Sequence, residues 1–237
     1  ELARDRGSRL LAITNVVGST LSRISDDVLY TRAGPEIAVA STKAYLAMLI
    51  GEYLLTLKMG RDRGRYTDGE AARMISGLRH LPGAAEAILE RADEIAEVAK
   101  RFDGADDVYF LGRGVDYAVA MEGSLKLKEI SYIHSEAMPA GELKHGTLAL
   151  VTDGTPVVTV LTQGDVYDKT VSALMEVKAR GARTIVVAYD DDDTILYLFD
   201  NDGYLVAEND DSPLVAGYAA LINGAPIEWP GRYYMVV

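Results

Sequence analysis

Side chains able to carry acid–base chemistry gather in residues 122–145, EGSLKLKEISYIHSEAMPAGELKH, which hold four carboxylates, three lysines and two of the chain's three histidines. Glu122, Lys126 and Glu129 are spaced i, i+4 and i+7, which places them on one face of a helix. On spacing alone, a solvated stripe of salt bridges is the more common arrangement. In a crevice, however, a carboxylate beside a lysine has a pKa that can be tuned for proton transfer.

The elements before and within this helix favour the chemical interpretation. An apolar strand, Val108–Leu111, leads into the turn Gly112–Gly114, and the helix follows. This order places a helix N-terminus at the carboxyl edge of a sheet, where α/β proteins bind small molecules. Other positions on the helix are apolar, which predicts that its other faces pack against the protein and that its charged face points into the crevice. These positions are Leu125, Leu127 and Ile130. The turn lacks the third glycine of a dinucleotide fingerprint, so we predict no nicotinamide or flavin cofactor.

A histidine in a glycine-flanked loop is the second candidate. His145 lies in GELKHG, residues 141–146, where the glycines allow a close approach to a ligand. A loop histidine titrates near neutral pH, which suits a proton carrier. The alternative is an exposed histidine without a role, and that alternative is stronger still for His80 and His134. The three histidines are too far apart in the chain for a metal-ligand pattern, so we predict no metal site.

Bulk composition narrows the class of protein. The chain has 237 residues, 49% of them apolar, a net charge of −12 and no cysteine. The acidity disfavours nucleic acid as a partner, and the lack of cysteine excludes disulfides and thiol catalysis. Residues 42–59 are apolar almost all round, but Glu52 interrupts them, so we predict a helix buried in a protein core and no membrane span. No basic-then-apolar leader opens the chain, and we expect a cytoplasmic location.

Strand-like and helix-like segments alternate along the chain, which predicts an α/β fold with parallel sheets covered on both faces, three layers deep. Predicted strands occupy 10–14, 28–33, 108–111, 156–162 and 184–188. Predicted helices occupy 37–59, 69–102 with an interruption near Pro82, 167–180 and 214–223. Two short segments have both a structural and a binding interpretation. Ser41-Thr42 is either a helix N-cap or a ligand contact. Residues 190–193, DDDD, are either a solvated turn or a cation site.

Two long stretches resemble the isomerase domain of the glutamine–fructose-6-phosphate aminotransferases. They are AMEGSLKLKEISYIHSEAMPAGELKHGTLAL at 120–150 and LAITNVVGSTLSRISDDVLYTRAGPEIAVASTKAY at 11–45, joined by the strand VYFLGRG at 108–114. The resemblance implies two doubly wound sugar-isomerase (SIS) subdomains, the first truncated at its N-terminus. We expect the partial first subdomain at 1–66, a helical connection at 67–102 and the second subdomain at 103–237.

The resemblance also implies an activity, the synthesis of glucosamine 6-phosphate from fructose 6-phosphate and ammonia. In that family Glu129 would be the base that moves a proton between sugar carbons 1 and 2, assisted by Lys126, and Glu122 would line the pocket. His145 would open the sugar ring from a neighbouring subunit, which implies a homodimer. Val39 and Ser41 would contact the sugar.

Three departures from the family's pattern limit that expectation. The family's phosphate-binding turn and its ammonia-supplying glutaminase domain are missing from the sequence. The segment after Tyr189 is shorter than in the family and has a different composition. The family's tail carries a lysine that forms a Schiff base with the sugar, whereas here the tail reads Tyr233-Tyr234-Met235 and no lysine follows Lys178. We therefore expect a part of a longer enzyme, with a non-catalytic sugar-phosphate-binding module as the alternative.

Overall fold

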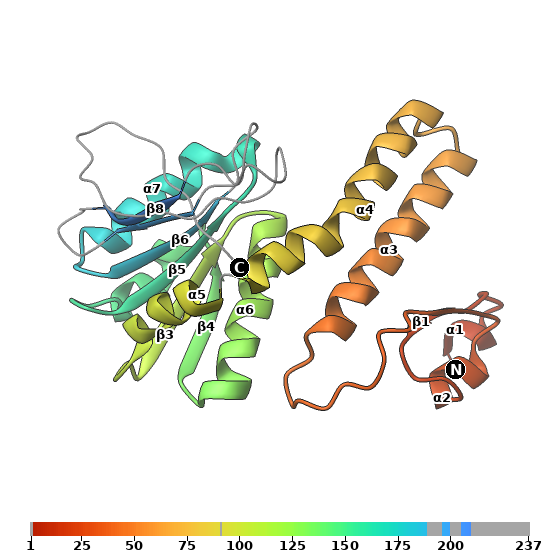
Figure 1. The fold of residues 1–237 in the computed structure, drawn as a ribbon, viewed down its shortest axis with the longest axis horizontal. Coiled ribbons are helices and arrows are strands. Elements are labelled where there is room, and N and C mark those ends of the chain that lie inside the picture. The colour runs from red at the N-terminus through yellow and green to blue at the C-terminus, as the bar shows by residue number, and fades with distance from the viewer. Residues whose placement is uncertain (1, 91, 189–195, 200–204, 210–237) are drawn as a thin grey trace. The chain divides into compact units, whose positions relative to one another are not determined.

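The structure, a computed structural model, describes residues 2–90, 92–188, 196–199 and 205–209 (Figure 1). The chain forms two compact units, Glu1–Pro82 and Gly83–Val237. The predicted helix at 214–223, the acidic run at 190–193 and the tail from 228 lie outside the described residues.

The first unit is built on a small parallel sheet. Its elements are α1 Leu2–Asp5, β1 Leu11–Thr14, α2 Thr20–Ile24, β2 Asp27–Tyr30, α3 Lys43–Asp62 and most of α4, Asp68–Leu89. Strands β1 and β2 pair in parallel, with Leu11 opposite Asp27. Helix α3 approaches this sheet closely at Gly51, where an added Cβ would lie 2.8 Å from the Leu29 side chain. The glycine is therefore what allows α3 to rest on the strands.

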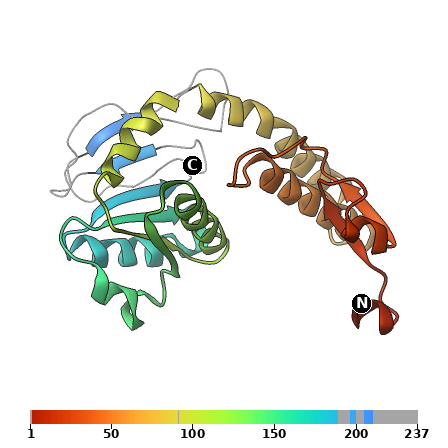
Figure 2. The same cartoon turned by 90° about the horizontal axis from the view of Figure 1, so that it is seen from below.

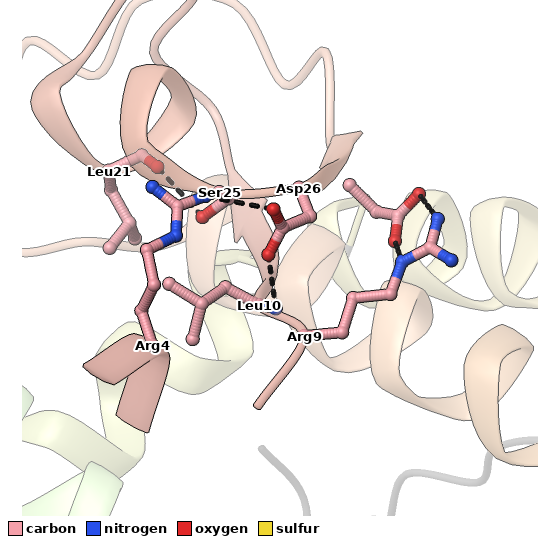
Figure 3. Close-up of polar contacts among 7 residues, drawn as sticks. Arg4, Arg9, Leu10, Leu21, Ser25 and Asp26 are labelled. Atoms are coloured by element: carbon pink, nitrogen blue, oxygen red, sulfur yellow. Dashed lines mark hydrogen bonds and ion pairs between the residues drawn. The ribbon is translucent and has the colours of Figure 1, made fainter. Parts of the chain in front are cut away.

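Charged side chains fix the entry to strand β1 (Figure 3). The Asp26 carboxylate accepts the Leu10 N–H at 2.7 Å and pairs with Arg4 at 2.8 Å. Beside it, Arg9 donates to Asp27 at 2.7 and 3.0 Å. These contacts join residues before β1 to Asp26 and to Asp27, the first residue of β2, and so align the two strands.

Two predictions for the first unit are wrong. Helix α3 begins at Lys43 instead of Ile37. It is also not buried: only Ala44, Gly51 and Leu57 are buried, while Leu46, Tyr53, Leu54 and Met59 are exposed. The reason is that a two-stranded sheet is too narrow to cover an apolar helix of this length. Within the described residues, no helix is both long enough and apolar enough to cross a bilayer.

Helix α4 also departs from expectation, because it continues through Pro82 without a break. Proline removes one backbone donor, so the carbonyl of Leu78 loses its usual partner. Pro82 and its neighbours Leu81 and Gly83 are exposed, so water can reach the freed carbonyl. The interruption falls later, between α4 and α5 (Ala92–Ala99).

The second unit holds a six-stranded sheet in the order β4-β3-β5-β6-β7-β8. Its strands are β3 Asp107–Gly112, β4 His134–Pro139, β5 Pro156–Leu161, β6 Arg183–Ala188, β7 Leu196–Phe199 and β8 Leu205–Asn209. The first four in spatial order are parallel, and β7 and β8 are antiparallel. The parallel α/β architecture predicted from the sequence is confirmed, while β4, β7 and β8 were not predicted.

Two helices cover opposite faces of that sheet. Helix α6, Val115–Ser131, connects β3 to β4, and α7, Tyr167–Lys178, connects β5 to β6. The two connections move in opposite directions across the sheet, so right-handed crossovers place the helices on opposite faces. Figure 2 shows α7, in blue-green, lying along one face. Strand β5 is central and buried at every position.

Candidate functional site

Helix α6 brings the three predicted charged side chains together. Lys126 Nζ lies 2.7 Å from Glu129 Oε2 and 3.3 Å from Glu122 Oε1. Each of the three side chains is only 22–26% exposed. The hydrogen bond to Glu129 is the main cause of a raised pKa at Lys126, and Glu122 adds to it. The group is therefore an ammonium held between two carboxylates, able to donate a proton or hydrogen bond on one side and to accept one on the other.

The surroundings of this trio differ from the prediction. Leu125 is 42% exposed and Ile130 67% exposed, so they do not pack within the unit, and only Leu127 lies against the core. The buried face of α6 carries Asp116, Ala120 and Ser124 instead. The charged trio is consequently flanked by open apolar surface.

The trio also does not lie in the crevice at the carboxyl edge of the sheet. Helix α6 starts at that edge and runs back toward the amino edge, as every crossover helix between parallel strands does. Glu129 is about 21 Å along the helix from Val115 at 1.5 Å per residue. It therefore lies near the opposite end of the helix from the glycine turn.

Both glycines of the turn before α6 are required by the backbone conformation. A Cβ on Gly112 would collide with the main chain of Asp116 and Tyr117, and Gly114 has φ 62° and ψ −128°, a conformation that side chains exclude. Asp116, in the first turn of α6, is buried and accepts the Thr162 N–H at 2.8 Å as well as its hydroxyl. Sequence reasoning missed Asp116, although an acid in the first turn of a helix was a signal for it.

His145 lies on the other side of the sheet from the trio. In β4, the hydroxyl of Ser135 meets Ser124 of α6, so odd-numbered residues of this strand face α6. Met138 faces the opposite way, and its Cε is 3.8 Å from where a Cβ on Gly146 would stand. Lys144 pairs with Glu176 of α7 at 2.8 Å, which places the loop on the α7 face. A single copy of the chain thus does not bring His145 to Glu129.

The local structure of that loop presents the imidazole outward. Leu143–His145 form a 3₁₀ turn in which the Leu143 side chain is buried and His145 is exposed. The other two histidines have structural partners: His134 Nδ1 lies 2.6 Å from Asp107 Oδ1, and His80 Nδ1 lies 2.7 Å from the Ser76 carbonyl. No cluster of His, Asp or Glu suited to a metal ion occurs in the part of the chain that the structure describes.

Val39 and Ser41 lie in the first unit, in the segment before α3. Val39 is 86% exposed, and Thr42 occupies the N-cap position of α3 without capping it through its own side chain. The cap is supplied by Glu36, whose carboxylate accepts the Ala44 N–H at 3.1 Å, and that bond is the main cause of a lowered pKa at Glu36. Glu36 was not predicted from the sequence. An acid shortly before a predicted helix start was the available signal.

A cavity of about 670 Å³ lies between α3 and α4 but holds none of the predicted site residues. Its charged lining is paired within the helix hairpin, Lys58 with Asp62 at 2.5 Å and Arg61 with Asp68. The residues predicted from the sequence to form the site therefore lie outside this cavity.

Known proteins share both sequence and fold with this chain. The glutamine–fructose-6-phosphate aminotransferase (isomerizing) of Symbiobacterium thermophilum is 49% identical over 237 residues, covering 96% of this chain and 39% of that protein. The enzyme of the same name from Caldanaerobacter subterraneus is 54% identical over 186 residues, covering 78% of this chain and 31% of that protein. The chain thus spans less than half the length of either relative.

A solved structure supports the same grouping. The C-terminal domain of glucosamine-fructose-6-phosphate aminotransferase from Francisella tularensis superimposes with a TM-score of 0.73 at 42% identity, over 76% of this chain and 51% of that one. The family model described as the SIS domain matches residues 1–58 and 102–223. The resemblance found in the sequence is confirmed, and the chain belongs to the SIS-domain family.

Proposed function

We propose that this chain is the isomerase part of an enzyme that converts fructose 6-phosphate and ammonia, released from glutamine by a separate glutaminase domain, into glucosamine 6-phosphate. The observation that carries the proposal is the Lys126–Glu129 pair, 2.7 Å apart and about three quarters buried. Relatives that are 49% and 54% identical carry the name of that activity. We propose residues 1–66 as part of the first subdomain, 67–102 as the helical connection and 103–237 as the second subdomain.

In this reaction Glu129 is the base. Ammonia condenses with the carbonyl at carbon 2 and water leaves, which gives an imine. The Glu129 carboxylate takes a proton from carbon 1 and returns it to carbon 2, while the hydroxyl proton of carbon 1 passes to the nitrogen, so that an aldehyde stands at carbon 1 and an amine on carbon 2. The Lys126 ammonium next to it stabilises negative charge that develops on the sugar oxygens. Glu122 holds Lys126 from the other side, at 3.3 Å, and so keeps the ammonium in place. Val39 and Ser41 are proposed as further contacts to the sugar.

His145 opens the sugar ring in this proposal, and it does so in the site of a second copy. The support is geometric: within one chain the His145 loop and the Glu129 helix cover opposite faces of one sheet. A histidine that must act on the same sugar as Glu129 then has to come from a partner, which makes a homodimer the working form.

The test uses two inactive variants of the full-length enzyme. Glu129→Gln and His145→Ala each remove one proton-transfer group, so each is expected to abolish formation of glucosamine 6-phosphate while leaving the melting temperature near that of the wild type. Mixing and refolding them at equal amounts gives mixed dimers with one intact site. Recovery of about a quarter of the wild-type activity is then expected from random pairing. Full activity of either single variant would refute its role, and no recovery would refute the shared site.

A second candidate function is a sugar-phosphate-binding module without catalysis. Both functions take the sugar phosphate as ligand, and only product formation distinguishes them. A rise in melting temperature with fructose 6-phosphate, in a wild-type enzyme that forms no product, would identify this function.

A further inference from the structure

The carboxylate of Glu36 closes the segment Ile37–Ser41 into a loop. Its Oε2 accepts the Ala44 N–H at 3.1 Å and the Thr42 N–H at 3.4 Å, and its Oε1 accepts the Thr42 hydroxyl at 3.4 Å. The residue on one side of the segment is thus bonded to the residues on the other side. One side chain thus joins the start of helix α3 to the residue before the segment.

Little else in the described first unit holds this segment. Ile37 is 92% exposed and Val39 is 86% exposed, so neither side chain anchors the backbone by packing. Ala40 alone is buried there, at 4% exposure. Two apolar side chains that point outward would favour collapse or disorder unless the backbone is held from both ends.

We propose that Glu36 is a positioning residue, which holds Ile37–Ser41 in the shape that contacts the sugar phosphate. The inference rests on the proposed function, in which Val39 and Ser41 touch the sugar. Glu36 acts through the segment, because its carboxylate oxygens are bonded to Thr42 and Ala44 at the far end of it. A segment that is already ordered loses less conformational entropy when the ligand binds, so the gain appears in affinity for the sugar phosphate.

The same unit offers a matched control in Glu70, which caps α4 with the same chemistry. The Glu70 carboxylate accepts the Thr67 N–H at 2.7 Å and the Thr67 hydroxyl at 2.6 Å. It lies in the first turn of α4, outside the Ile37–Ser41 segment. Removing either carboxylate weakens a helix cap, but only the removal of Glu36 releases the segment.

The experiment compares Glu36→Ala, Glu36→Gln and Glu70→Ala in the full-length enzyme. Glu36→Ala is expected to raise KM for fructose 6-phosphate about tenfold, with kcat within about twofold of wild type, because it removes order from the free enzyme rather than a group from the chemistry. Glu36→Gln restores part of the affinity, since its amide oxygen still accepts backbone N–H groups. Glu70→Ala lowers the melting temperature by a similar amount and leaves KM unchanged.

Two different outcomes would overturn the inference, and they are distinguishable. If the wild type is active and Glu36→Ala loses melting temperature with an unchanged KM, Glu36 is only a helix cap. If Glu36→Ala and Glu70→Ala raise KM equally, the effect is general destabilisation. A wild-type enzyme that neither binds nor converts fructose 6-phosphate would instead remove the proposed function, and this inference with it.

Discussion

Replacing Asp116 with alanine removes the acceptor that ties the start of helix α6 to the residue after strand β5. Asp116 is 1% exposed, and its two carboxylate oxygens accept the backbone N–H of Thr162, at 2.8 Å, and the Thr162 hydroxyl. These residues are 46 positions apart in the chain. The contact therefore closes the carboxyl edge of the sheet across two neighbouring strands, β3 and β5.

The size of the loss follows from those two bonds. Hydrogen bonds to a charged acceptor contribute about 1.5–3 kcal/mol each, and the truncation also leaves the partly buried Thr162 N–H without a partner. The free energy of unfolding is expected to fall by about 3–5 kcal/mol, near the upper end for single substitutions. For a domain of this size that corresponds to a fall in melting temperature of roughly 6–20 °C.

The assay is urea unfolding followed by circular dichroism, with differential scanning calorimetry as a second measurement. Asp116→Asn keeps one acceptor oxygen and the shape of the side chain, so it should lose less than the alanine variant. Asp165→Ala, an exposed acid in the nearby turn, serves as the control and should be close to neutral. An Asp116→Ala protein within about 1 kcal/mol of the wild type would show that the contact does not organise this edge.

Two further predictions concern stability. Thr159 is fully buried in strand β5 and its hydroxyl has no hydrogen-bond partner among the described residues, so Thr159→Val should stabilise by about 1–2 kcal/mol. The equally buried Thr170 donates to the Val166 carbonyl at 2.9 Å, so Thr170→Val should destabilise in the same urea titration; a loss at both positions would contradict the reasoning. The pKa of Asp26 is lowered, mainly by the hydrogen bond from the Leu10 N–H and to a smaller extent by Arg4. The Asp26 carboxylate therefore stabilises the first unit at pH values above its unfolded-state pKa of about 4. This stabilisation is lost as the pH falls through the lowered folded-state pKa. The urea midpoint of the wild type should exceed that of Asp26→Asn at about pH 6, and the excess should shrink as the pH falls below about 4. An excess that stays constant over that range would assign the effect to something other than ionisation.

Four of the predicted strands carry apolar runs and are present, whereas β4, β7 and β8 were missed, although β7 reads LYLF and is itself apolar. Strands β1, β3, β5 and β6 match predicted segments within two residues at each end. Strand β4 reads HSEAMP and lies at the edge of the sheet, where alternate residues need no apolar side chain. The start of α3 moved to Lys43 because a side chain before the helix, Glu36, determines the cap. Periodicity does not record such a contact.

For the candidate site, spacing was informative only where all members share one helix. The i, i+4, i+7 pattern predicted one face for Glu122, Lys126 and Glu129, and their ion pairs at 2.7 and 3.3 Å agree. The expected packing of Leu125 and Ile130 was wrong, because both side chains are exposed on an apolar flank that nothing in the described second unit covers. The roles assigned to the trio stay predictions.

His145 shows why residue types near one another in the sequence need not form one site. Its loop follows Glu129 by only a few residues beyond β4, yet the strand between them directs Ser135 toward α6 and Met138 to the opposite face. The loop then follows the face that α7 covers, where Lys144 meets Glu176. The helix before a strand and the loop after it can lie on opposite faces of the sheet, and the composition of the strand does not indicate this. If Glu129 and His145 act on the same sugar, the sheet between them excludes a site within one copy. The short distance between the two residues in the sequence then becomes an argument for two chains.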